Sequence, residues 1–387
     1  MSVNIDELLK VAVAKRGSDV HLKVGCPPTV RVDGHLEPLD PSIRLTQEDA
    51  VAVAFSIMNN TQKQRFKEKS EIDLAYSAPG LGRFRVNCYQ QRGTVNMVFR
   101  SVPTKILTFQ DLHLPSVIEK LASETRGLIL VTGTTGSGKS TTLAAIIDHI
   151  NRTRTENIIT IEDPIEFLHR DRKCLVSQRE IGADTESFST ALRSALRQDP
   201  DVILVGEMRD FETISTALVA AETGHLVMST LHTVDATETV NRIISVFPPY
   251  QQKQVRLQLA GVLKGVISQR LVPKIDGQGR VPAVEVMVAT QTIRECVIDA
   301  DKTRRIHDVI GAGTSQYGMQ TFDQSLAQLC RDKLIAYEEA LRWSSNPDDF
   351  ALKMKGVQST GDLTWETQKP APAAAPDPGF KIERFGT

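Results

Sequence analysis

A glycine-rich phosphate-binding pattern constrains this 387-residue chain more than any other feature. The apolar residues 128–131 predict a buried strand, and helix-compatible residues continue from the pattern through Ile150. The pattern G-x-x-x-x-G-K-S therefore lies between a strand and a helix, which is the context that a phosphate loop requires. Its residues are Gly133, Thr134, Thr135, Gly136, Ser137, Gly138, Lys139, Ser140 and Thr141.

Each part of this pattern has a physical role toward a phosphate. Glycines allow backbone conformations in which consecutive N–H groups face one anion, and the start of the helix adds partial positive charge. Lys139 is expected to neutralise the β- and γ-phosphates, and the Ser140 hydroxyl to join Mg²⁺. The sequence thus predicts a chain that binds ATP with Mg²⁺, against the alternative of a plain glycine-rich turn.

The bulk composition limits the class of protein. A net charge of −1 argues against a protein dominated by nucleic-acid binding, so no nucleic acid is expected as a partner. No apolar run approaches the roughly 18 residues that span a bilayer, and no signal peptide is recognised, so a cytoplasmic protein is expected. The cysteines are scattered without metal-ligand spacing, which indicates reduced thiols and no zinc site. They are Cys26, Cys88, Cys174, Cys296 and Cys330.

The first part of the chain, residues 1–103, is expected to form a small α+β domain with an antiparallel sheet. Alternating strands are predicted around a strong hairpin signal at Asp33–Gly34. Arg83 and Arg85 share one face of their strand by its period of two, and Arg100 lies on another strand. These arginines are either a solvated sheet face or arginine fingers aimed at a phosphate across a domain or subunit boundary.

The rest of the chain divides into three parts. Residues 104–111 are expected to be a linker. Residues 112–361 alternate strands with helices, which predicts an α/β domain with a parallel sheet followed by C-terminal helices. Within it a long helix is expected over residues 250–269. Residues 362–387 are rich in proline and alanine and are expected to be disordered.

Three polar side chains are predicted at carboxyl ends of strands in this sheet, which is where ligands bind in such folds. They are Glu162, Glu207 and His232. Glu162 is the better candidate to polarise the attacking water and Glu207 to reach the metal, although spacing alone leaves the two roles open. A structural ion pair with Arg193 or Arg197 is the alternative for either carboxylate.

The strand that His232 ends also has a histidine at its start. His225 lies at its start, seven residues earlier, so the two side chains point to opposite faces and are not expected to share a metal. His232 is placed to sense the γ-phosphate. His225 is equally compatible with a core or interface role.

Four sequence blocks together resemble the secretion ATPase superfamily. They are the phosphate loop at 133–141, an acidic box at 159–166, a Walker B motif at 206–210 that includes Arg209, and a histidine box at 222–233. Within the superfamily the resemblance is to the PilT family of type IV pilus retraction ATPases, and it covers about residues 4–345.

This resemblance implies a PAS-like N-terminal domain, a RecA-like ATPase domain and a homohexameric ring. ATP hydrolysis would rotate the domains to power pilus retraction, at the cytoplasmic face of the inner membrane on a pilus platform protein, with a paralogous retraction ATPase as a further partner. In the family, the acidic-box glutamate is the general base, which maps to Glu162. N-terminal arginines reach the nucleotide, which favours Arg83, Arg85 and Arg100, and Arg126 is also expected near it.

Two departures from the family pattern bear on the function. Residues 292–299 keep Ile293, Arg294 and Ile298 of the retraction-motif helix but differ elsewhere. The proline-rich tail is similar to that of the accessory PilU family, which is one alternative. The other is a motor for pilus extension or type II secretion, which the missing zinc cysteines and the short N-terminal part disfavour. A nucleotide-gated adaptor and a DNA translocase are weaker alternatives.

Overall fold

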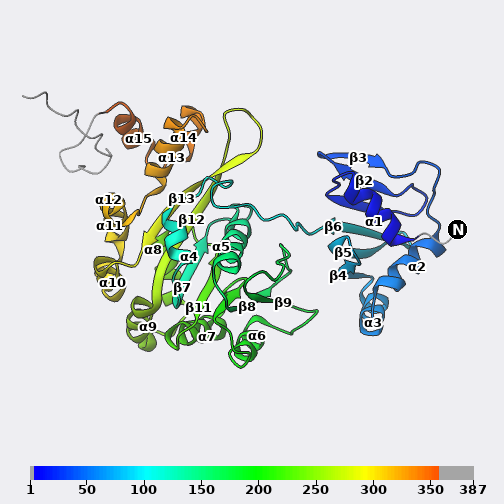
Figure 1. Ribbon diagram of the computed structural model, residues 1–387, viewed down its shortest axis with the longest axis horizontal. Helices are drawn as coiled ribbons and strands as arrows, with labels where there is room; N and C mark the ends of the chain where they lie inside the picture. Colours follow the sequence, from blue (N-terminus) through cyan, green and yellow to red (C-terminus); the bar gives the residue numbers. More distant parts are fainter. Residues whose placement is uncertain (1–3, 357–387) are drawn as a thin grey trace, which may run out of the picture.

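The computed structural model describes residues 4–356, which contain two β-sheets joined by an extended connection (Figure 1). The first sheet has the strand order β3-β2-β1-β6-β5-β4, and all its neighbouring strands are antiparallel. Its strands are β1 (Asp19–Leu22), β2 (Thr29–Val32), β3 (His35–Pro38), β4 (Glu71–Ala78), β5 (Gly82–Gln91) and β6 (Thr94–Ser101). The helices beside it are α1 (Ile5–Ala14), α2 (Gln47–Ile57) and α3 (Asn60–Lys69).

The first sheet has one apolar and one polar face because side chains alternate along each strand. On β5, Phe84, Val86 and Cys88 are buried in a core shared with the three helices. Arg83 and Arg85 therefore point to the opposite face. Arg100 of β6 is the register partner of Arg85, so these arginines form one basic face.

The second sheet has the order β13-β12-β7-β11-β10-β8-β9 and is parallel except for the β12–β13 hairpin. Its strands are β7 (Gly127–Thr132), β8 (Asn157–Glu162), β9 (Leu175–Glu180), β10 (Val202–Val205), β11 (Leu226–Leu231), β12 (Leu263–Pro273) and β13 (Arg280–Val288). The helices are α4 (Val117–Ala122), α5 (Lys139–Thr153), α6 (Phe188–Ala195), α7 (Phe211–Glu222), α8 (Ala236–Ser245), α9 (Pro249–Val262), α10 (Gln291–Ile298), α11 (Ile306–Ala312), α12 (Thr314–Tyr317), α13 (Phe322–Arg331), α14 (Tyr337–Trp343) and α15 (Pro347–Met354), with a 3₁₀ turn η1 (Ala300–Arg305).

Helices cover both faces of this sheet, and every residue of its interior strand β7 is buried. Leu128 and Leu130 pack into a core with α6 to α11, whereas Ile129 and Val131 pack on the other face with α4 and α5. A strand buried on both faces reads as a continuous apolar run, which is why residues 128–131 were recognisable in the sequence. This packing fixes the carboxyl end of β7, where the phosphate loop begins.

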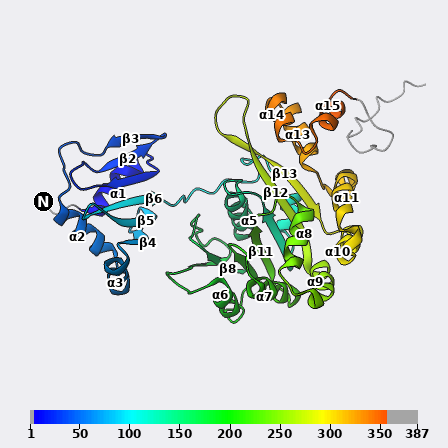
Figure 2. The same ribbon diagram turned by 180° about the vertical axis from the view of Figure 1, so that it is seen from behind.

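The predicted helix over residues 250–269 is wrong in its second half. Helix α9 ends at Val262, and β12 begins at Leu263. Residues 263–268 pair with β7 on one side, and residues 265–273 pair with β13 on the other, so ladder hydrogen bonds replace helical ones. Beyond this pairing the hairpin extends past the sheet and packs against α13 to α15 (Figure 2). The predicted tail 362–387 lies outside the described residues.

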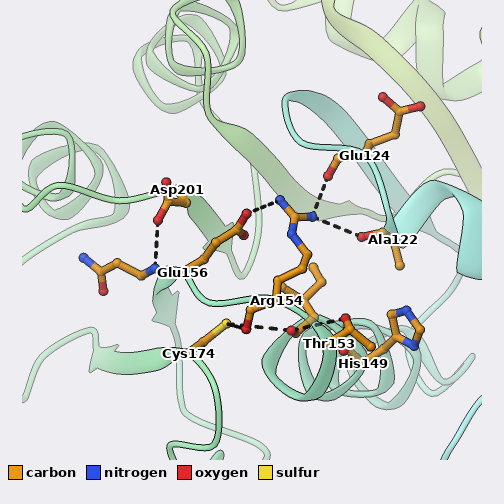
Figure 3. A network of polar contacts seen from close by, with 10 residues as sticks. Ala122, Glu124, His149, Thr153, Arg154, Glu156, Cys174 and Asp201 are labelled. Atoms are coloured by element: carbon orange, nitrogen blue, oxygen red, sulfur yellow. Dashed lines mark hydrogen bonds and ion pairs between the residues drawn. The ribbon is translucent and has the colours of Figure 1, made fainter.

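The side chain of Arg154 connects two segments at the amino end of this sheet (Figure 3). Its Nη1 donates to the carbonyl oxygens of Glu124 at 2.7 Å and Ala122 at 3.4 Å, and its Nη2 donates to Glu156 Oε1 at 2.6 Å. The carbonyl of Arg154 in turn accepts from Cys174 Sγ at 3.1 Å. The side chain thus joins the end of α4 to the connection between α5 and β8.

We expect Arg154→Met to lower the free energy of unfolding by about 2–4 kcal/mol, because it leaves a largely buried carboxylate and two carbonyls without their donor. Calorimetry should show a lower melting temperature. The matched control is Arg152→Met: Arg152 is more exposed, and its partner Asp148 retains Arg172 at 3.5 Å. A change within about 0.5 kcal/mol is expected there. Equal melting temperatures for both variants would contradict this role of Arg154.

Candidate functional site

The phosphate loop connects β7 to α5 through three glycines with positive φ. Gly133, Gly136 and Gly138 have φ values of 141°, 78° and 92°. A Cβ on Gly133 would lie 2.5 Å from the carbonyl oxygen of Gln269 and 2.6 Å from Ser137 Oγ, so no larger residue fits there without displacing backbone. Gly138 is the N-cap residue of α5, which leaves the N–H groups of the first helical turn available to an anion.

Lys139 is folded over this loop. Its Nζ donates to the carbonyl oxygens of Gly133 at 2.8 Å and Thr134 at 3.0 Å. Burial lowers the pKa of Lys139, while the nearby charges of Glu207 and Glu166 act in the opposite direction. The buried hydroxyl of Ser137 has no hydrogen-bond partner within the described residues. A buried cation and an unpartnered hydroxyl beside free helical N–H groups fit a bound phosphate chain.

A pocket of about 700 Å³ opens at this loop and is large enough for a nucleotide. It brings together segments from four strand ends. The lining includes residues 135–141, Glu162, Asp163, Glu166, Glu207, Arg209, Asp210, Thr230, His232, Leu271 and Arg280. Of the predicted residues, the structure therefore places Glu162, Glu207, Arg209 and His232 around Lys139, Ser140 and Thr141.

Glu162 ends β8, and three donors hold its carboxylate. Thr160 Oγ1 and Gln178 Nε2 donate to Oε1 at 2.6 and 3.0 Å, and the Glu166 N–H donates to Oε2 at 3.4 Å. Burial raises the pKa of Glu162, and the hydrogen bonds from Thr160 and Gln178 oppose this rise. A desolvated, oriented carboxylate with a raised pKa suits proton transfer.

Glu207 follows β10 and lies beside Arg209 and His232. Its Oε1 is 2.5 Å from Arg209 Nε and 3.3 Å from His232 Nε2. The hydrogen bond from Arg209 raises the pKa of that guanidinium. His232, just after β11, is thus linked to the Walker B carboxylate. The alternative of Arg193 pairing with one of these carboxylates is wrong, because Arg193 pairs with Glu212.

The three N-terminal arginines do not line the pocket in this conformation. Each is paired with a carboxylate instead. Arg83 contacts Glu180 at 3.1 Å, Arg85 contacts Glu166 at 4.0 Å, and Arg100 contacts Asp19 at 2.7 Å. The first two pairs cross from the N-terminal domain to the last residue of β9 and to the loop after β8, in the part of the ATPase domain that extends toward it (Figure 1).

Arg126 and His225 lie at the opposite end of the sheet from the pocket. Arg126 directly precedes β7, whose far end leads into the phosphate loop. The carbonyl of His225 accepts from the Gly127 N–H at 2.9 Å, and its Nδ1 lies 2.9 Å from the Ala220 carbonyl. The expectation that Arg126 lies near the nucleotide is therefore corrected by the direction of β7.

Gln178 is a site residue that the sequence reasoning missed. It lies on β9, a strand that was not predicted, because the run 175–180 has little apolar character. Its Nε2 donates to Glu162 and to the Phe167 carbonyl at 2.9 Å, and its Oε1 accepts from the His169 N–H at 2.8 Å. Leu271 and Arg280 were also missed, since only the β12–β13 hairpin brings them to the pocket.

We expect Gln178→Leu to lower kcat by about tenfold and to move the acid limb of the pH–rate profile to higher pH. The hydrogen bond from Gln178 holds down the pKa of Glu162, so its loss lets that pKa rise further and protonates Glu162 at a higher pH. A pH series of phosphate release measures this shift. Gln198→Leu, at an exposed position beside Ser194, is the control and should leave the profile unchanged. An unshifted acid limb in Gln178→Leu would contradict the role.

No group of three or more His, Cys, Asp or Glu side chains in residues 4–356 could hold a metal ion. Over the same range, every helix is too short or too polar to cross a bilayer.

Comparisons with known proteins agree with this geometry. The family model for type II/IV secretion system proteins matches residues 2–343. The chain is 47% identical over 348 residues to the type IV pilus retractation ATPase PilT of Pseudomonas aeruginosa, which is 90% of this chain and 100% of that protein. It is 42% identical over 361 residues to the type IV pilus ATPase PilU of the same organism, covering 93% of this chain and 94% of PilU.

A solved structure gives the same result. The crystal structure of the pilus retraction motor PilT with bound ADP is similar with a TM-score of 0.82 and 47% identity, covering 90% of this chain and 98% of that chain. This match confirms the predicted α/β fold with an N-terminal domain before an ATPase domain. The chain belongs to the type II/IV secretion system protein family and, within it, to the PilT family of pilus retraction ATPases.

Proposed function

We propose that this chain is an ATP-hydrolysing motor that powers retraction of type IV pili. The observation that carries the proposal is the pocket in which Lys139 of the phosphate loop shares one cavity with Glu162, Glu207 and His232. That pocket occurs in a chain that is 47% identical to a pilus retraction ATPase over nearly its whole length.

In the proposed reaction, a water oxygen bonds to the γ-phosphorus while the bond from that phosphorus to ADP breaks, and ADP and phosphate leave. Glu162 accepts the proton of the attacking water, since its carboxylate is desolvated and oriented by three donors. Lys139 exchanges the Gly133 and Thr134 carbonyls for phosphate oxygens. His232 reports the state of the γ-phosphate through its contact with Glu207.

Mg²⁺ is the expected cofactor, and it would neutralise charge on the β- and γ-phosphates. Ser140 and Glu207 would hold it, one through a hydroxyl and the other through a carboxylate. This small donor set fits a cation that takes most of its ligands from phosphate and water rather than from a cage of protein side chains.

In the proposed ATPase cycle, the N-terminal arginines act when the N-terminal domain has closed over the nucleotide pocket. Arg83, Arg85 and Arg100 share one face of the first sheet, and two of them already contact the end of β9 and the loop after β8. Domain closure would bring this basic face onto a nucleotide phosphate. We further propose that the motor is a homohexamer, peripheral to the cytoplasmic side of the inner membrane, on a pilus platform protein.

A second candidate is an accessory retraction ATPase that works with a paralogous motor. It is favoured by the PilU match, which extends over 93% of this chain. A strain that lacks this chain tests both, with the parent or the Lys139→Ala variant supplied in trans. The main proposal expects piliated cells without retraction, restored by the parent only. Residual retraction in the deletion strain would support the accessory role, and cells without pili would overturn both.

A further inference from the structure

The Arg83–Glu180 ion pair differs from the other two arginine pairs in being both buried and between domains. Arg83 lies on β5 of the first sheet and Glu180 ends β9 of the second, 3.1 Å apart, with 20% and 7% of their side chains exposed. The Arg85–Glu166 pair also joins the domains, but its atoms are 4.0 Å apart and both side chains are more than 40% exposed. Arg100 and Asp19 both belong to the first sheet. Of these three partner carboxylates in the described residues, Glu180 is therefore the one placed to hold its arginine firmly across the domain boundary.

The same carboxylate also holds the turn that follows Glu162. Glu180 Oε2 accepts from the Ile165 N–H at 3.1 Å as well as from Arg83. Glu180 and Glu162 are register partners across β8 and β9. A further backbone hydrogen bond runs from Leu168 N–H to the Pro103 carbonyl in the connection between the domains, at 3.3 Å. Glu180 thus links the position of the N-terminal domain to the acidic box.

A buried carboxylate that loses its cation is unfavourable, because it keeps the cost of desolvation without the attraction. Arg83 therefore leaves Glu180 only when another anion attracts it more strongly or when the movement of the domains exposes Glu180 to water. A nucleotide phosphate is such an anion. If nucleotide binding requires Arg83 to be free, the apparent affinity equals the intrinsic affinity multiplied by the fraction of molecules in which Arg83 is free of Glu180.

We propose that Glu180 is a positioning residue that competes with nucleotide phosphate for Arg83 and so sets the ATP concentration at which the N-terminal domain closes. This inference rests on the proposed function in one respect, the contact of Arg83 with a phosphate. Beyond that contact, Glu180 is a regulating carboxylate that lies outside the nucleotide pocket.

The test is Glu180→Gln in the full chain, with a fluorescent ATP analogue to measure affinity and phosphate release to measure turnover. Glutamine keeps an oxygen acceptor for the Ile165 N–H and removes only the charge that holds Arg83. We expect KM and the dissociation constant of the analogue to fall by about threefold to tenfold, with kcat within about twofold of the parent. A purely structural role would instead lower kcat or thermal stability. An unchanged or raised KM would overturn the proposal.

A double-mutant cycle separates competition for Arg83 from a general effect of removing negative charge. In the Arg83→Ala background, Glu180→Gln should no longer change the affinity, because the arginine through which it acts is gone. Tightening that persists in that background would overturn the proposal. Glu212→Gln, which removes the partner of Arg193 inside the ATPase domain, is the control for charge and should change affinity less than twofold.

Different measurements test the role of Arg83 and the role of Glu180. If Arg83→Ala hydrolyses ATP at the parent rate, the role of Arg83 in the proposed function is wrong. The analogue titration needs no turnover, so it still reports on Glu180 if the chain does not hydrolyse ATP.

Discussion

The Glu162→Gln variant is expected to bind ATP within about twofold of the parent affinity and to hydrolyse it roughly a thousandfold more slowly. Glutamine preserves the shape of the side chain and an acceptor for Thr160 and Gln178, the donors on Oε1. It cannot accept the proton of the attacking water. The effect should therefore fall on kcat, which phosphate release measures, whereas titration with a fluorescent ATP analogue should show little change.

The same experiment decides between the two acidic residues of the pocket. Glu207 Oε1 is already engaged by Arg209 Nε at 2.5 Å and lies 3.3 Å from His232 Nε2, so this oxygen is less free than the Glu162 carboxylate to take up the attacking water. If Glu162→Gln retained turnover while Glu207→Gln lost it, the general base would be Glu207. In the parent, burial raises the pKa of Glu162, so activity should fall with decreasing pH at a higher pH than for an ordinary glutamate. Glu162→Gln should remove this limb from the residual activity.

Local patterns in the sequence were sufficient for the phosphate loop and for the carboxyl ends of β8, β10 and β11. Each strand there is mostly apolar and largely buried, and a charged or histidine side chain stands at or just after its carboxyl end. The direction of a parallel strand then places Glu162, Glu207 and His232 at one edge. Arg126 precedes β7, so the direction of the same parallel sheet places it at the opposite edge.

Other features depend on contacts between distant segments. Residues 263–268 form a strand because β7 and β13 flank them, a pairing that the local helical pattern of residues 250–262 obscures. Gln178 gains its role only because β9 lies beside β8, and Arg83 meets Glu180 across 97 residues of chain. No short pattern in the sequence encodes these juxtapositions, because tertiary packing overrides local preference at such positions.

The Gly133→Ala variant is expected to weaken ATP binding by at least about a hundredfold, or roughly 3 kcal/mol. An alanine Cβ there would lie 2.5 Å from the Gln269 carbonyl oxygen and 2.6 Å from Ser137 Oγ. The backbone φ of 141° is also one that side-chain-bearing residues rarely adopt. Relief of the clash must move the loop away from β12, and this movement separates the carbonyls that hold Lys139 from the N–H groups of α5. The loss should be measured as analogue affinity on folded protein.

A matched control is available at the other end of the same strand. Gly127 has a φ of 111°, and a Cβ on it would lie 2.6 Å from the Val262 carbonyl oxygen, so Gly127→Ala introduces a comparable backbone clash far from the pocket. That variant should lower the melting temperature by several degrees while the folded fraction binds ATP within about threefold of the parent. Equal losses of affinity in both variants would mean that β7 transmits strain along its length. A loss confined to Gly133→Ala would show that the close approach of the loop to β12 is what shapes the phosphate site.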